Sequence, residues 1–332
     1  MVAGEIDTPR RGARWKGRDL LILAVKTTVT AGCFWYIFRQ IQPDRFVRSV
    51  MALQLGWVAV ALLAALTQVL LVAIRWSAIV NALSAAGRKI SVATAFAITM
   101  TGAFLGLVLP YVAGDAARAW LLVQHGRDWR TSLLSVVIDR AVGAGMLCAL
   151  GFVILLFPQA ALSLGAHRAP ALQAFGAMLA IGVIGLLAAP WLASVLERWR
   201  LTRWISAVAF AAHHAVLGSR KTMLILSATL TVHALSMLAI WALGRAQGIS
   251  LAPIDVAILF VVMIAATIFP LSVGGWGVRE VAAIGFLSAR GVPVEQALFL
   301  SLSFGVVGIL ATLPGAALWF LVRPASDRSA PG

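Results

Sequence analysis

The chain has 332 residues, of which 61% are hydrophobic and 12% are charged. This composition excludes a soluble globular domain and predicts an integral helical membrane protein. In a soluble chain the formal net charge of +15 would suggest nucleic-acid binding, but here most lysines and arginines flank apolar runs. Such flanking charge favours contact with anionic lipid headgroups, so we expect the membrane, and no nucleic acid, as a partner.

Six apolar runs are long enough to cross a bilayer, which takes about 20 residues per helix. They cover residues 20–38, 55–74, 131–157, 171–192, 223–243 and 297–322. Because no small-residue cleavage site lies near the end of the first run, we expect residues 1–19 to be a basic cytoplasmic tail before a retained span. Residues 20–323 then form a single transmembrane domain, and residues 324–332 form a C-terminal tail.

Two further apolar segments, residues 92–123 and 254–288, are each interrupted near the middle. The breaks contain prolines and glycines, which disfavour a continuous helix, at Pro110, Gly114, Pro270, Gly274, Gly275 and Gly277. Each arm is too short to span a bilayer, so both segments are predicted to be re-entrant helical hairpins that face the protein interior. The alternative is that both are ordinary loops between full spans.

The hairpins divide the chain into two similar units, residues 55–157 and 223–322, each with a span, a hairpin and a span. Between the units, residues 196–221 mix cations with aromatic and aliphatic side chains, which is typical of an amphipathic helix in the membrane interface. Interrupted segments in corresponding positions of two halves indicate a transporter with an inverted repeat and a central binding site.

The charges of the loops predict the orientation of the chain. Cytoplasmic loops are enriched in lysine and arginine, and this bias places both termini in the cytoplasm and lets the two hairpins enter from opposite faces. One loop fits poorly, because Arg39, Arg45 and Arg48 would then lie on the outer side. Arg75 and Trp76 end the second span in this interpretation, as an interfacial pair of a cation and an amphipathic ring.

Charged residues also lie inside the apolar segments, at Asp115, Arg118, Asp139, Arg140, Arg279 and Glu280. A charge at the centre of a membrane helix costs about 2.5 to 3.5 kcal/mol, so such residues are functional candidates. Asp115 and Arg118 are three residues apart and can pair on one helix face. Arg279 and Glu280 are neighbours in the sequence, which predicts that they point in different directions and have separate partners.

The arginines of this set suit a phosphate-bearing headgroup, because a planar guanidinium can donate two parallel hydrogen bonds to phosphate. Asp115, Asp139 and Glu280 would pair with them at rest or exchange protons during transport. The alternative is that these charges only lock helix contacts through buried ion pairs. We expect no metal or cofactor, because Cys33 and Cys148 have no metal-ligand spacing, and no enzyme, because the sequence has no known catalytic motif.

Four motifs occur together along the chain: Arg75-Trp76, Pro110 to Arg118 with Gly114-Asp115, Val136 to Gly143 around Asp139-Arg140, and Pro270-Leu271-Ser272 followed by Gly274 to Glu280. In this combination they resemble the transmembrane region of the lysylphosphatidylglycerol synthase family, also called flippase-like domain proteins. The likeness covers nearly the whole chain, and the last motif is the most specific. The family usually has Glu after the glycine of the second motif, where this chain has the shorter Asp115.

The resemblance implies a lipid flippase or transporter of the bacterial inner membrane, which moves a phosphate-bearing phospholipid, glycolipid or polyprenyl-linked lipid between leaflets. We expect no synthase activity, because the sequence ends soon after Arg323, where the aminoacyl-transfer domain of bifunctional members would begin. Two alternatives remain open. One is a non-transporting membrane subunit that binds a lipid intermediate for a partner glycosyltransferase, which would make a lipid-biosynthetic enzyme its partner. The other is a membrane-embedded lipid-modifying enzyme.

Overall fold

The computed structural model describes residues 17–84, 89–108, 111–191, 203–218, 220–268 and 272–322. Throughout these ranges the chain forms helices joined by turns, without strands. Five segments are long and apolar enough to cross a membrane: Leu55–Leu83, Trp129–Leu156, Pro158–Leu187, Thr222–Ala246 and Val294–Trp319. They correspond to five of the six predicted spans. The remaining predicted span coincides with α1 (Gly17–Phe38), a helix of 22 residues that is not among these five.

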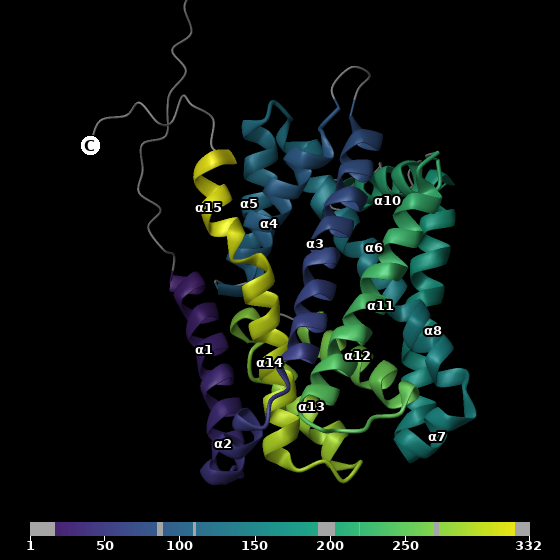
Figure 1. Cartoon of the computed structure of the whole chain (residues 1–332). Helices are drawn as coiled ribbons and strands as arrows, with labels where there is room; N and C mark the ends of the chain where they lie inside the picture. The colour runs from purple at the N-terminus through teal and green to yellow at the C-terminus, as the bar shows by residue number, and fades with distance from the viewer. Residues whose placement is uncertain are drawn as a thin grey trace, which may run out of the picture.

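The first unit consists of two short helices between two long ones (Figure 1). These are α3 (Leu55–Leu83), α4 (Val92–Val108), α5 (Tyr111–Gln124) and α6 (Trp129–Leu156). With 17 and 14 residues, α4 and α5 are each shorter than a membrane span. Asp128 is the N-cap of α6, and its carboxylate accepts the backbone N–H of Thr131 at 2.8 Å. This hydrogen bond lowers the pKa of the Asp128 carboxyl.

The second unit has the same order of long and short helices. It comprises α11 (Thr222–Ala246), α12 (Pro253–Ile268), α13 (Val278–Ser288) and α14 (Val294–Thr312), and α15 (Pro314–Val322) follows it. The pair of α4 and α5 lies in the upper half of Figure 1, whereas α12 and α13 lie in the lower half. The long helices α3 and α11 pack against each other, so the two units share one helical bundle.

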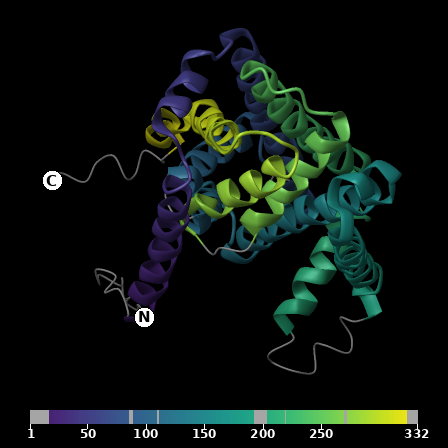
Figure 2. The ribbon, with the colours of Figure 1, turned by 90° about the horizontal axis from the view of Figure 1, so that it is seen from below.

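The remaining helices surround this bundle. They are α2 (Pro43–Met51), α7 (Pro158–Leu164), the 3-10 turn η1 (Gly165–His167), α8 (Arg168–Leu187) and α10 (Arg203–Val216). Seen from below, α13 lies near the centre, whereas α1 and α10 lie at the margin (Figure 2). Within the predicted interfacial segment 196–221, α10 is the helix among the described residues, and residues 196–202 and 219 lie outside them.

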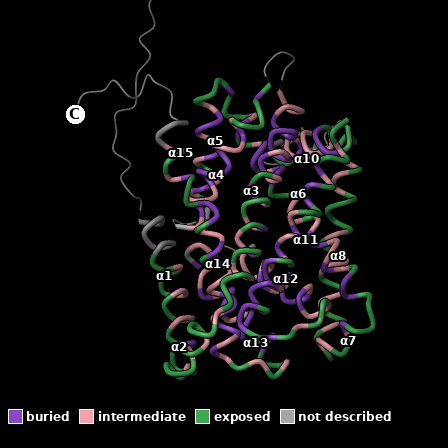
Figure 3. Tube along the Cα trace, in the orientation of Figure 1, coloured by how far each residue is buried: buried purple, intermediate pink, exposed green. Residues whose placement is uncertain are grey.

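Many residues of the long helices are exposed (Figure 3), and large apolar side chains are among them. Leu63 on α3 is 66% exposed and Ile181 on α8 is 72% exposed. The most apolar 18-residue stretch of Pro158–Leu187 contains no buried residue at all. A surface of this kind would not be stable in water. It is the surface that a multi-pass membrane protein presents to lipid.

The structure describes part of the predicted break between α12 and α13. Gly274, Gly275 and Gly277, between α12 and α13, have φ angles of 61°, 80° and 89°, which residues with a Cβ rarely adopt. Pro110 and Pro270 lie outside the described residues. Gly114 was expected in the first break, but it lies inside α5. There a Cβ would overlap the carbonyl oxygen of Gly102, so this glycine lets α5 approach the backbone of α4 closely.

Replacing Gly114 by alanine should therefore lower the unfolding temperature of the purified protein, measured by tryptophan fluorescence in detergent. The added methyl group forces α4 and α5 apart, and overpacking of this kind costs about 1 to 3 kcal/mol. Gly285→Ala in α13 is the matched control, because no atom lies within 4 Å of the position that its Cβ would take. Equal unfolding temperatures for the two variants would contradict the close packing of α4 and α5.

Candidate functional site

An ion network joins three helices in the first unit. Asp139 on α6 lies between two arginines: its Oδ1 accepts Nε–H of Arg75 on α3 at 2.8 Å, and its Oδ2 accepts both Nη groups of Arg118 on α5 at 3.1 Å. All three side chains are buried, with at most 6% of their surface exposed. Each guanidinium compensates the burial of the carboxylate, so the arrangement is stable only while all three charges are present.

Aromatic and hydroxyl groups hold the two arginines in place. The Arg118 guanidinium carbon lies 4.5 Å from the ring centroid of Trp76, and the Trp76 indole donates to Ser135 Oγ at 3.2 Å. Arg75 also donates to Thr229 Oγ1 on α11 at 3.3 Å. The prediction of an interfacial Arg75-Trp76 pair was therefore wrong. Both residues are buried, because α3 continues beyond them to Leu83.

Arg140, the next residue on α6, faces a different partner. Its Nε and Nη2 groups donate to Asp115 at distances from 2.7 to 3.1 Å, and 44% of its side chain is exposed. Asp115 lies 3.8 Å from Arg118, so the predicted pair within α5 forms only a loose contact. Counted over the described residues, the network contains three arginines and two aspartates, which leaves one excess positive charge.

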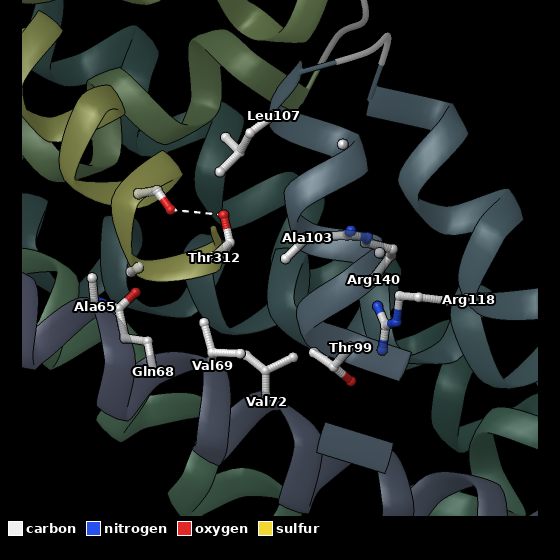
Figure 4. A pocket seen from close by; sticks show the side chains of 14 residues that line it. Ala65, Gln68, Val69, Val72, Thr99, Ala103, Leu107, Arg118, Arg140 and Thr312 are labelled. Carbon is white, nitrogen blue, oxygen red and sulfur yellow. Dashed lines mark hydrogen bonds between the residues drawn. The ribbon is translucent and has the colours of Figure 1, made fainter. Parts of the chain in front are cut away.

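A cavity of about 260 Å³ opens beside this network (Figure 4). Its walls come mainly from α3, α4 and α14, and its lining residues are Ala65, Gln68, Val69, Val72, Thr99, Gly102, Ala103, Gly106, Leu107, Arg118, Arg140, Gly308, Ala311 and Thr312. Figure 4 shows Thr99, Arg118 and Arg140 grouped on one side, across from Gln68 and Thr312. The excess positive charge therefore lies in the wall of the cavity.

Two buried polar atoms in the residues of this wall have no hydrogen-bond partner. They are the hydroxyl oxygen of Thr99 and the Nε of Arg118, and each of these residues is 3% exposed. An unpartnered buried donor costs about 1 to 3 kcal/mol, which a hydrogen-bond acceptor on a ligand would offset. The chemistry of the wall, which combines guanidinium groups and a hydroxyl group, suits an anion with several oxygen atoms. Thr99 was not singled out from the sequence, because threonine is common in apolar helices.

Arg279 and Glu280 form a separate pair at the start of α13. Arg279 Nη2 donates to Glu280 Oε1 at 2.6 Å, and Ser301 on α14 donates to the same oxygen at 3.0 Å. The expectation of separate partners was wrong. Glu280 bends back to accept the backbone N–H of Gly277 at 2.6 Å, and this orientation brings its carboxylate to the neighbouring guanidinium.

The α13 pair lies outside the lining of the cavity. Arg279 is 6% exposed and stacks 4.7 Å from the Trp276 ring centroid, while Glu280 is fully buried. Gly305 on α14 makes room for the guanidinium and the indole ring of this stack, since a Cβ there would lie 2.5 Å from Arg279 Nη2 and 2.6 Å from an indole carbon of Trp276. The structure therefore brings Asp115, Arg118, Asp139 and Arg140 together, and it places Arg279 and Glu280 in a neutral contact between α13 and α14.

The fold and the site define an all-α multi-pass membrane protein with a buried ion network beside a cavity. A family model, the lysylphosphatidylglycerol synthase TM region, matches residues 23–315. The chain belongs to this family, as its motifs predicted, and the family relates it to the handling of lipids. The match ends at residue 315 and includes no synthase domain. No curated protein sequence matches the chain.

Replacing Asp139 by asparagine should strongly destabilise the protein, because Arg75 and Arg118 would then be buried without an anion. Breaking a buried pair in this way costs about 3 to 5 kcal/mol. Arg140→Gln is the control, since it removes an ion pair of which one side is 44% exposed, and exposed pairs contribute about 1 kcal/mol or less. Thermal unfolding in detergent measures both effects, and similar unfolding temperatures would show that Asp139 does not hold the helices together.

Proposed function

We propose that the protein is a lipid flippase or transporter that moves a phosphate-bearing lipid between the leaflets of a bacterial inner membrane. The observation that carries this proposal is the excess positive charge in the wall of the cavity, inside a domain whose outer surface is apolar. Burying such a charge is costly in a membrane protein, so its presence favours an anionic ligand. A phosphate group is the anionic part that membrane lipids share.

Arg140 and Asp115 are the residues we expect to respond to the ligand. Their pair is the exposed edge of the network, so a phosphate can replace the Asp115 carboxylate as the partner of Arg140 without disturbing Asp139. Thr99 and Arg118 Nε would then donate to the remaining phosphate oxygens, which gives partners to the two unpartnered atoms. The acyl chains would stay in the lipid beside the cavity, and the bonds of the lipid would not change.

The two pairs of short helices supply the alternating exposure in this proposal. We infer that α4–α5 and α12–α13 are re-entrant hairpins that enter the membrane from opposite faces, as an inverted repeat requires. Their lengths of 17, 14, 16 and 11 residues support this, since none reaches a full span. The hairpins meet where the 3-10 turn η2 (Val273–Gly275) contacts α4 and α5, next to the cavity. Rocking of one hairpin against the other would open the cavity to one leaflet at a time.

Leaflet exchange in liposomes tests the transport proposal. Purified protein should exchange fluorescent phosphate-bearing lipids, and Arg140→Gln should slow the exchange about tenfold or more, because it removes a charged hydrogen-bond donor. Arg130→Gln is the matched control, since Arg130 is exposed near the start of the same helix and does not line the cavity. Binding without exchange would instead favour the non-transporting subunit. A lipid of altered mass after incubation would identify a lipid-modifying enzyme.

Cysteine labelling tests the opposite orientation of the hairpins. In a background without Cys33 and Cys148, Arg130→Cys at the start of α6 reports on the connection that follows the α4–α5 hairpin, and Ser288→Cys reports on the end of the α12–α13 hairpin. We expect a membrane-impermeant maleimide to label Ser288→Cys in intact cells and Arg130→Cys only in inverted vesicles, because the hairpin ends would lie on opposite faces. Labelling of both from the same side would contradict the inverted repeat and the cytoplasmic position of the termini.

A further inference from the structure

A second polar cavity lies at the end of the molecule where α2 packs against α14. Its volume is about 380 Å³, and it is lined by Arg45, Arg48, Ser49, Ala52, Gln247, Pro293, Glu295 and Gln296. The first cavity involves residues 65 to 72 of α3, whereas this one lies next to the start of that helix. At 1.5 Å per residue the two cavities are therefore roughly 20 Å apart along α3.

The walls of this second cavity are held by defined contacts. Glu295, which is 5% exposed, accepts the backbone N–H of Gln42 at 3.1 Å, and Gln42 caps the start of α2. Phe46 on α2 and Phe299 on α14 pack edge to face with their centroids 5.6 Å apart. The position of α2 against α14 is thus fixed, and with it the backbone positions of the two arginines that α2 contributes.

Part of the charge and hydrogen-bonding capacity of this cavity has no partner among the described residues. Among the described residues, Arg45, Arg48 and Glu295 form no ion pair with each other or with any other side chain. Gln247 is 8% exposed, and its buried Oε1 has no hydrogen-bond partner, although its Nε2 donates to the Leu243 carbonyl oxygen. The cavity therefore offers two cations for an anion and two acceptors, Gln247 Oε1 and Glu295, for a donor.

We propose that this second cavity binds the headgroup of a phospholipid that has a phosphodiester and also N–H or O–H donors, such as an ethanolamine or glycerol headgroup. Arg45 and Arg48 pair with the phosphodiester, while Gln247 Oε1 and Glu295 accept from the amine or hydroxyl groups. The exposed apolar side chains Val47, Val50 and Met51 make α2 an amphipathic helix suited to the membrane interface, where such headgroups lie.

This site also gives a reason for the cations of the loop with Arg39, Arg45 and Arg48, which fits the positive-inside bias poorly. The arginines of α2 lie at the end of the molecule opposite to α4 and α5 (Figure 1), where the orientation rule expects few cations. A headgroup site at that end gives Arg45 and Arg48 a function that the bias does not describe. Lipid binding in this second cavity does not depend on lipid transport through the first cavity.

Native mass spectrometry of the detergent-solubilised protein with phosphatidylethanolamine, phosphatidylglycerol and phosphatidylcholine tests this proposal. The first two carry donors and the third does not, so we expect wild type to bind the first two about fivefold more tightly than phosphatidylcholine. Gln247→Met should weaken this preference, because methionine has a similar length and no amide oxygen, while the Glu295 carboxylate remains. If wild type shows no preference, or the variant keeps it in full, the assigned role of Gln247 is wrong.

The arginines are tested by the double variant Arg45→Ala/Arg48→Ala, which should weaken binding of all three lipids about tenfold or more. Arg39→Ala is the matched control, since Arg39 lies over the Trp35 ring at 4.8 Å and does not line the cavity. An equal loss in both would show that general surface charge attracts the lipids, and the site would be rejected. Unfolding temperatures confirm that each variant is folded.

A soluble phosphodiester carries the same polar groups as a phospholipid headgroup, and a competition experiment distinguishes these two ligands. Glycerophosphoethanolamine, which has the headgroup without acyl chains, should not displace phosphatidylethanolamine at equal concentration, because it cannot contact the apolar face of α2. Displacement would mean that the site takes a soluble phosphodiester, and it would overturn the assignment to a lipid. The leaflet-exchange assay provides a separate readout, so failure of transport and failure of this site can be told apart.

Discussion

The first unit depends on the Asp139 carboxylate, whose two oxygens pair with two different arginines, Arg75 and Arg118. Three helices meet at one buried carboxylate, and each of them contributes a charge that would be costly to bury alone. The network ties the short helix α5 to the long helices α3 and α6, because α5 by itself has only 14 residues with which to pack. It thereby fixes the wall of the cavity that Arg118 and Arg140 line.

The two groups of candidate residues differ in how completely their charges are compensated. In the α13 pair, one guanidinium meets one carboxylate, and Ser301 and the Gly277 N–H complete the hydrogen bonds of Glu280. Such a neutral and saturated contact holds helices together. The Asp139 network instead has an arginine in excess and unpartnered atoms beside a cavity. This difference, rather than the presence of charge, separates a structural role from a candidate binding role.

The polar cavities lie at different depths of a molecule whose outer surface is apolar. One lies beside the middle of α3, and the other lies next to its start, where α2 packs against α14. Both combine arginines with polar groups that lack protein partners, so both suit the polar part of an amphiphile whose chains remain in the membrane. Two cavities of this kind are consistent with a family that handles lipids. A lipid headgroup needs polar contacts wherever it leaves the bilayer surface.

The sequence by itself determined the all-α architecture, the order of long and short helices and the family, because hydropathy and motif spacing are properties of local segments. It also identified Asp115, Arg118, Asp139, Arg140, Arg279 and Glu280 as one set of candidates, since a charge in an apolar run is visible without a fold. Only the tertiary structure decided the partners. Arg75 and Asp139 are 64 residues apart, and their contact depends on the rotation and packing of separate helices. The same reason hid the place of Thr99 in the cavity wall and the cavity at α2 from the sequence. The pairing of Arg279 with Glu280 was missed for a local reason, because it depends on Glu280 bending back to the Gly277 N–H.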